Sequence, residues 1–234
     1  VVMRETDVQI LFDDEAQRWE KRYEEKFYLD RLHILDQWLT NKGAINKLEA
    51  LDVGCGTFPS SKIYSSHCVK AFGIDISPNM ISHAQKMGRN AVHYDGVNFP
   101  SAENTFDIIT MFNVIEFVND ADLLFKEINR VSKQGALFLF TIVNYKNIIR
   151  KYVRYKHRHN SIKFRREWVN SYDLDSINSL LSKSGFSNIK IYKHSIPTLY
   201  DRIFSKTPEI FLPLFRNKLF SDCIYIEATK NSNL

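Results

Sequence analysis

The stretch Leu51-Asp52-Val53-Gly54-Cys55-Gly56-Thr57 decides the fold of this chain. It begins in an apolar run, 48–53, that is predicted to be a β-strand, and it ends in a glycine-containing turn before a short predicted helix, 60–66. In a parallel sheet, ligands bind beyond the carboxyl ends of the strands. Gly54 and Gly56 let a ligand approach the backbone closely, which a Cβ atom would block. The stretch therefore predicts a ligand site at the end of a first parallel strand.

Strand and helix signals alternate along the rest of the chain. Apolar or β-branched runs predict further strands over 71–75, 91–94, 106–111, 136–141, 189–192 and 223–229. Apolar periodicity, N-caps and closing glycines predict helices over 15–39 (in one or two pieces), 77–86, 121–131 and 173–184. This alternation is typical of βαβ units with right-handed crossovers. We therefore expect an α/β fold with a doubly wound, mostly parallel seven-stranded sheet.

The chain of 234 residues contains no internal repeat, low-complexity tract or linker, so a single domain is predicted. Within it, residues 1–46 form a helical lid and residues 47–143 form the ligand-binding core. Residues 144–234 supply substrate-side insertions and the closing strands.

A carboxylate at the end of the second strand identifies the kind of ligand. Asp75 follows Gly56 by nineteen residues, where a carboxylate can accept hydrogen bonds from both hydroxyls of a ribose. A dinucleotide site would need a third glycine, but Pro59 stands there, and no Gly-Lys-Ser/Thr follows as in a phosphate-binding loop. The expected ligand is a nucleoside without a pyrophosphate. The alternative is a tight strand-to-helix turn that binds nothing.

Taken together, four motifs resemble those of class I S-adenosylmethionine-dependent methyltransferases, of the methyltransferase type 11 group. They are Asp52-Val53-Gly54-Cys55-Gly56-Thr57, Phe72-Gly73-Ile74-Asp75-Ile76-Ser77, Tyr94-Asp95-Gly96 and Asn104-Thr105-Phe106-Asp107-Ile108-Ile109. The resemblance implies a Rossmann-like methyltransferase fold, S-adenosylmethionine as cofactor and methyl transfer as the reaction. It is specific for the cofactor and says little about the acceptor.

The resemblance also implies a set of cofactor-binding residues. Gly54 and Gly56 would line the methionine and ribose part, Asp75 would hold the ribose, and Phe112 and Asn113 would lie near the sulfonium. The full set is Arg31, Asp52, Gly54, Cys55, Gly56, Asp75, Ile76, Met80, Asp95, Gly96, Phe112 and Asn113. Ile76 and Met80 would flank the adenine, and Asp95 and Gly96 would meet its amino edge. For Ile76, Met80 and Phe112, simple core packing is the alternative.

Within the class, the N-terminal pattern Phe12-x-x-x-Ala16-x-Arg18-Trp19 with Leu29-x-Arg31-Leu32 is similar to that of ubiquinone-biosynthesis O-methyltransferases. Arg31 would then pair with the cofactor carboxylate, a contact that suits a guanidinium; a solvated arginine is the alternative. Those enzymes carry Glu-x-x-Glu-His after the fourth strand. Here Asn113 and Phe117 replace the first Glu and the His, and only Glu116 remains. Since one carboxylate is too few for a divalent ion, no metal is expected.

Positive charge is concentrated in one segment. Residues 146–166 contain nine Lys/Arg and no Asp or Glu, which leaves 23 basic and 27 acidic residues elsewhere. We expect the segment to contact an anionic acceptor, with a solvated helix face as the alternative. The candidate substrate residues are Tyr23, Tyr28, Arg154 and Arg158, and the candidate catalytic bases are Glu116 and His159.

These features favour an enzyme that methylates a small molecule with apolar and anionic parts, on oxygen rather than nitrogen. One alternative is an RNA or protein methyltransferase that uses the segment 146–166; the absence of Asn/Asp-Pro-Pro-Tyr/Phe after the fourth strand argues against a nucleic-acid base. Another is a non-catalytic cofactor-binding partner subunit. A peripheral membrane contact stays open, and so does the oligomeric state. With three scattered cysteines and no apolar leader, a cytoplasmic location is expected.

Overall fold

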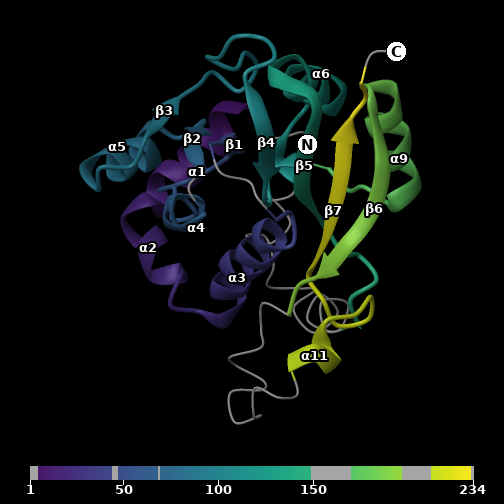
Figure 1. Ribbon diagram of the computed structural model, residues 1–234. Coiled ribbons are helices and arrows are strands. Elements are labelled where there is room, and N and C mark those ends of the chain that lie inside the picture. The colour runs from purple at the N-terminus through teal and green to yellow at the C-terminus, as the bar shows by residue number, and fades with distance from the viewer. Residues whose placement is uncertain (1–4, 44–46, 68, 149–169, 197–211, 233–234) are drawn as a thin grey trace.

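The computed structural model describes residues 5–43, 47–67, 69–148, 170–196 and 212–232. Seven strands form one sheet (Figure 1): β1 (Glu49–Val53), β2 (Lys70–Asp75), β3 (Ala91–His93), β4 (Phe106–Met111), β5 (Ser132–Val143), β6 (Phe186–His194) and β7 (Cys223–Lys230). The helices are α1 (Glu5–Glu15), η1 (Ala16–Arg18), α2 (Trp19–Arg22), α3 (Lys26–Thr40), α4 (Ser61–Ser66), α5 (Pro78–Lys86), η2 (Ile115–Phe117), α6 (Ala121–Val131), α9 (Leu174–Lys183) and α11 (Leu212–Phe215).

The strand order is β3-β2-β1-β4-β5-β7-β6, in which β7 is antiparallel to both of its neighbours. The remaining pairs are parallel, so the prediction of a doubly wound, mostly parallel seven-stranded sheet is confirmed. Val53 lies opposite both Ile74 of β2 and Met111 of β4. The carboxyl ends of β1, β2 and β4 therefore lie side by side at one edge of the sheet.

Helices cover both faces of the sheet, because its central strands are apolar on both sides. On one face, Ile34, Leu35 and Trp38 of α3 pack with α4 and α5 against Ala50 and other strand residues. On the other face, the apolar sides of α6 and α9 pack against β4, β5 and β7. The two layers hold the strand ends, and hence the site, on a rigid base.

The structure refines several predicted boundaries. Helix α1 begins at Glu5, ten residues before the predicted start of N-terminal helix, and its sequence has little apolar periodicity. The helical stretch 15–39 is interrupted between Arg22 and Lys26, where three residues form turns. Strand β5 starts at Ser132, but regular pairing with β4 begins only at Leu137 because Gly135 has a positive φ of 73°.

None of the helices in the described part of the chain has the length and apolarity that crossing a lipid bilayer requires. The division into lid, core and late insertions stays a prediction.

Candidate functional site

The loop after β1 lies against the end of β2. The backbone N–H groups of Gly54 and Cys55 both donate to the carbonyl of Ile74, at 2.8 and 3.0 Å. Gly54 and Gly56 have φ values of +68° and +56°, which side chains rarely adopt. A Cβ at Gly54 would overlap the side chain of Val114, and one at Gly56 would lie 2.7 Å from Trp19 Nε1. The glycines are required by the chain's own packing, a reason the sequence did not reveal.

Asp75 lies at the centre of this loop. One carboxylate oxygen accepts the backbone N–H of Gly56 at 2.7 Å, and the other accepts that of Ser77 at 2.9 Å. Each oxygen has a further lone pair, so the carboxylate can still accept two hydroxyls. Burial raises the pKa of Asp75 to about 6, although the two N–H donors act in the opposite direction. Asp75 is thus ionised at neutral pH and is held by the backbone in a fixed orientation.

A second group of residues meets where β4 ends. Arg31 of α3 is buried and donates to the side-chain oxygen of Asn113 at 2.7 Å. Its guanidinium lies over the ring of Tyr28, 5.2 Å from the centroid, and its Nε has no partner. Asn113 has a φ of +58° and donates from its side chain to Cys223 Sγ at 3.3 Å. An unpartnered buried Nε beside a strained residue is what a site for an anionic group needs.

A small cavity joins these two groups. It is lined by Tyr23, Arg31, Leu32, Asp52, Gly54, Cys55, Ser60 and Phe112. Its volume of about 20 Å³ has room for a water molecule, whereas small-molecule sites measure roughly 300–1,000 Å³. Six of the eight lining residues had been predicted as site residues, so the structure brings these six together. The cavity as it stands is therefore too small for a cofactor.

Asp52 and Tyr23 are two of the ionisable residues that line this cavity. Asp52 accepts from the hydroxyls of Ser60 (2.5 Å) and Thr110 (2.8 Å), and burial raises its pKa to about 6. Burial also raises the pKa of Tyr23 to about 12. The Tyr23 phenol is therefore neutral at pH 7 and can donate a hydrogen bond but not act as a base. Tyr28 adjoins it with ring centroids 5.5 Å apart, and its hydroxyl accepts from Arg22 at 3.0 Å.

The residues predicted to hold the adenine lie further along the same edge. Met80 is buried on α5, and Ile76 packs against the core. Asp95 is exposed, and its carboxylate accepts the backbone N–H groups of Val97 and Asn98, which lowers its pKa. The Asp95 side chain thus stabilises the turn that follows it. The roles of these residues toward a cofactor stay predictions.

The N-terminal helices cover this edge through contacts that sequence reasoning missed. Glu20 of α2 accepts from the Thr57 hydroxyl and pairs with Arg89 at 2.8 Å, while Arg89 also donates to the carbonyl of Thr57 at 2.6 Å. Trp19 Nε1 lies over Gly56, is buried and has no hydrogen-bond partner. No local pattern could have indicated the Glu20–Arg89 pair, because its members are 69 residues apart.

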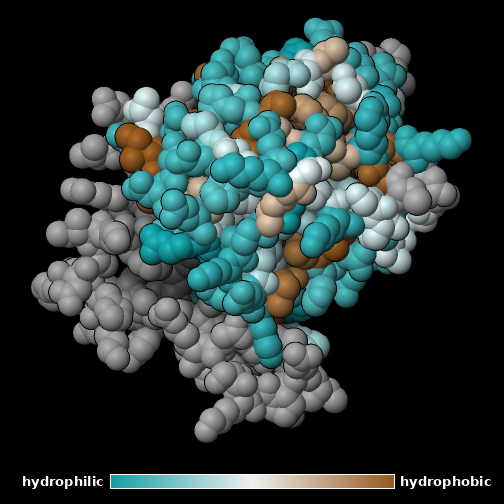
Figure 2. Space-filling model, turned by 90° about the vertical axis from the view of Figure 1, so that its left-hand side faces the viewer, coloured by the Kyte–Doolittle hydropathy of each residue, from teal (hydrophilic) through white to brown (hydrophobic). Residues whose placement is uncertain are grey.

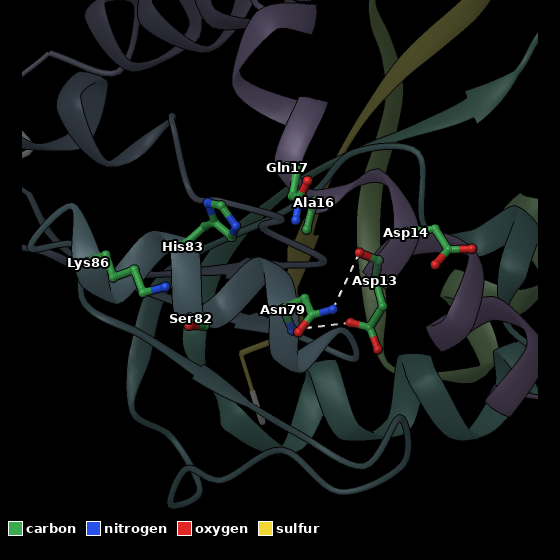
Figure 3. Close-up of a pocket in the computed structure, with 8 residues that line it drawn as sticks. All are labelled: Asp13, Asp14, Ala16, Gln17, Asn79, Ser82, His83 and Lys86. Carbon is green, nitrogen blue, oxygen red and sulfur yellow. Dashed lines mark hydrogen bonds between the residues drawn. The ribbon is translucent and has the colours of Figure 1, made fainter.

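Asp13 joins α1 to the start of α5. Its carboxylate accepts from the Ser77 hydroxyl and from the backbone N–H of Asn79, and its carbonyl accepts from the Asn79 side chain (Figure 3). A polar hollow of about 350 Å³ lies between the two helices. It is lined by Asp13, Asp14, Ala16, Gln17, Asn79, Ser82, His83 and Lys86. Although larger than the cavity beside Arg31, it includes none of the predicted site residues.

The predicted catalytic bases are differently placed. Glu116 in η2 is buried, and its carboxylate accepts the backbone N–H of Val143 at 2.7 Å, at the end of β5. This contact positions the strand end, and a role as a base stays a prediction. His159, Arg154 and Arg158 lie outside the described residues. Within the described ranges, no group of three or more His, Cys, Asp or Glu is arranged to hold a metal ion; the expectation of a metal-free reaction stays a prediction.

Comparisons with known proteins bear on the family and the fold. A family described as a methyltransferase domain matches residues 51–140. The demethylmenaquinone methyltransferase of Staphylococcus haemolyticus is 27% identical over 186 residues, which cover 69% of this chain and 76% of that protein. The ubiquinone biosynthesis O-methyltransferase of Coxiella burnetii is 30% identical over 121 residues, 49% of this chain and half of that protein.

Among solved structures, magnesium protoporphyrin IX methyltransferase from Synechocystis PCC 6803, with bound SAH, superimposes with a TM-score of 0.73. The match covers 97% of this chain and all of that one at 14% identity, which establishes the fold.

Proposed function

Because this chain is a class I methyltransferase whose cofactor is S-adenosylmethionine, we propose that it methylates a small organic acceptor, on oxygen rather than nitrogen. The observation that carries the proposal is the enclosure of the site. Trp19 lies over Gly56, and the ring of Phe12 contacts that of Phe117, 5.2 Å between centroids. A site covered by helices at the strand ends suits a small molecule better than an RNA duplex or a folded protein.

The residues present fit the cofactor. Asp75 would accept the ribose hydroxyls, because its lone pairs remain available beside the Gly56 and Ser77 N–H groups. Arg31 would pair with the methionine carboxylate through its unpartnered Nε. Trp19 Nε1 is a second buried donor at the same edge. S-adenosylmethionine supplies a methyl group already activated on a sulfonium, so the protein mainly binds, orients and excludes water.

The acceptor side is aromatic. Tyr23 and Phe112 line the cavity beside Arg31, Tyr28 lies against the Arg31 guanidinium, and the Tyr23 phenol can orient an acceptor oxygen by donating a hydrogen bond. Such walls suit an acceptor with an apolar body and an anionic or hydroxyl group. The preference for oxygen is supported by the similarity to the ubiquinone biosynthesis O-methyltransferase.

The test is a transfer assay with deuterated-methyl S-adenosylmethionine and separate panels of phenols, carboxylic acids, amines and total RNA. We expect mass spectrometry to locate the label on oxygen of a small molecule, and Asp75→Ala at the same concentration to label far less. EDTA in a parallel reaction should leave the rate unchanged. Labelling confined to amines would refute the preference for oxygen, and labelling confined to RNA or protein would refute a small acceptor.

A further inference from the structure

An exposed apolar surface with lysines lies beside the site. It consists of Lys146, Ile148, Pro213, Leu214, Lys218 and Leu219, all of which are exposed. Ile148, Leu214 and Leu219 expose 45%, 64% and 47% of their surface. Large aliphatic residues exposed together, rather than singly, mark interaction surfaces. We call this group the α11 surface.

Backbone and side-chain hydrogen bonds bring its three aliphatic residues together. The N–H of Ile148 donates to the carbonyl of Leu219 at 2.8 Å, although the two residues are far apart in the sequence. Asn217 links the other two, because its side-chain nitrogen donates to the carbonyl of Leu214 at 2.7 Å and its oxygen accepts the N–H of Leu219 at 2.8 Å. The aliphatic side chains therefore project from one compact structure.

Two buried asparagines fix this structure to the sheet. Asn144 donates to the carbonyls of Lys218 (2.9 Å) and Ser221 (2.8 Å). Asn147 donates to the carbonyl of Phe220 and to the carboxylate of Asp222, each at 2.7 Å. Both asparagines are almost fully buried, so their amides are committed to holding the two chain segments together. The exposed side chains are thus presented on a preorganised base.

The charge of this surface has one sign. Residues 144–148 and 212–221 contain no Asp or Glu. Arg216 is neutralised by the buried Asp30, whereas none of the ion pairs found among the described residues involves Lys146 or Lys218. Among the described residues, the aliphatic side chains of this surface are accompanied by Lys146 and Lys218 and by no carboxylate. Aliphatic side chains beside lysines are complementary to anionic lipid.

The α11 surface lies at the same edge of the sheet as the site. Its two segments follow β5 and precede β7, and α11 lies beyond those strand ends in Figure 1. Cys223, the first residue of β7, contacts Asn113 of the site. In contrast, the face that carries α5 is mainly hydrophilic, with hydrophobic residues in small separate groups (Figure 2).

We propose that the α11 surface docks on an anionic phospholipid bilayer, with Ile148, Leu214 and Leu219 entering the interface and the lysines facing lipid phosphates. The substrate part of this proposal rests on the proposed function, because it takes the small acceptor to be an amphipathic molecule from the membrane. Docking itself requires no acceptor.

The experiment measures flotation of the full chain, without acceptor, with vesicles of phosphatidylcholine alone or with 30% phosphatidylglycerol, about as anionic as many natural leaflets. Ile148→Ser/Leu214→Ser/Leu219→Ser should lower binding to anionic vesicles at least tenfold. The matched control, Ile10→Ser/Met87→Ser/Ile191→Ser, changes aliphatic residues of similar exposure elsewhere (60%, 51% and 45%) and should bind like the wild type. Lys146→Gln and Lys218→Gln should each lower binding about fivefold at low salt.

Equal binding to both vesicle types, no binding to either, or an equal loss in the control variant would overturn the proposal. A concentration-dependent dimer that the α11 variant abolishes, without vesicle binding, would assign the surface to a second copy instead. The transfer assay on water-soluble acceptors is independent of this result. Methyl transfer to a small molecule without vesicle binding would support the proposed function and overturn docking. Vesicle binding with transfer only to RNA or protein would support docking and overturn the proposed function.

Discussion

The two halves of the site are built in opposite ways. The half formed by β1 and β2 consists of backbone loops: Asp75 is held by N–H groups of Gly56 and Ser77, at most 19 residues away. The half beyond β4 and β5 consists of side chains from distant segments, such as Arg31 with Asn113, 82 residues apart, and Asn144 with Ser221, 77 apart. The first half therefore depends mainly on neighbouring residues and strand register. The second half depends on how distant segments of the chain pack together.

The largest effect is expected from Gly54→Ala. The methyl group would overlap the Val114 side chain at a φ of +68°, so overpacking and strain together should lower the free energy of unfolding by about 2–4 kcal/mol. Urea unfolding measures this loss of stability. Adding Val114→Ala should restore part of the loss, because the overlap disappears while the strain remains. If the double variant lost the full sum of the losses measured for Gly54→Ala and Val114→Ala alone, the overlap would contribute nothing.

Asp75→Ala should weaken S-adenosylmethionine binding by about 1.5–3 kcal/mol, the range for hydrogen bonds to a charged group. Calorimetry measures the affinity, and circular dichroism establishes that the variant is folded. If the halves are separate, the KM for the acceptor should change little. An unchanged affinity for the cofactor in a folded variant would remove the ribose assignment.

Asn147→Ala tests the other half. It leaves the Phe220 carbonyl and the Asp222 carboxylate without this donor in a buried setting, which should lower the free energy of unfolding by about 1–3 kcal/mol. We expect weaker vesicle flotation and an unchanged affinity for S-adenosylmethionine. A matching loss of cofactor affinity would mean that the two halves are coupled.

The pH dependence separates binding from stability. Since the pKa of Asp75 is about 6, cofactor affinity should rise with pH, by about fivefold between pH 5 and 6 and about twofold more by pH 7, and level off above that. Stability should change in the opposite direction. From about pH 4 to 6 the folded state holds a proton on Asp75 that the unfolded chain, at its ordinary pKa of 3.8, has lost. The free energy of unfolding contributed by this group therefore falls as pH rises through that range.

Calorimetry at several pH values measures how cofactor affinity depends on pH, with Asp75→Asn as the control. The variant cannot titrate at this position and should lose the steep segment of the profile. A wild-type profile that is flat between pH 5 and 7 would contradict the role given to the carboxylate.

The smallest effect is expected from Glu20→Gln. Its ion pair with Arg89 is partly exposed, so the free energy of unfolding should fall by about 0.2–1 kcal/mol, and by less in high salt. Because Glu20 holds the lid on the Thr57 loop, S-adenosylmethionine should associate faster in stopped-flow fluorescence of Trp19, with stability nearly unchanged. Exchange of the exposed Glu24 for Gln is the control. An identical association rate in both variants would mean that the lid contact does not limit entry.

The motif residues were predictable because their positions follow from strand register. Once 48–53 and 71–75 are parallel neighbours, Gly54, Gly56 and Asp75 must meet at one edge. Asp95 differs from Asp75 in that one of its carboxylate oxygens accepts two backbone N–H groups of a local turn. The contacts of Asp13, Glu20 and Arg89 had no local signal, because each joins a helix to a loop tens of residues away.

The sequence by itself determined the fold class and the cofactor class, and it predicted the glycine loop as the cofactor site, because periodicity, caps and glycine turns are properties of neighbouring residues. Only the tertiary structure decided what covers that loop, which carboxylates are buried enough to have a pKa near 6, and which residues form the α11 surface. Burial and long-range pairing depend on how layers pack. A side chain's surroundings, rather than its identity, fix the charge it carries and the partner it contacts.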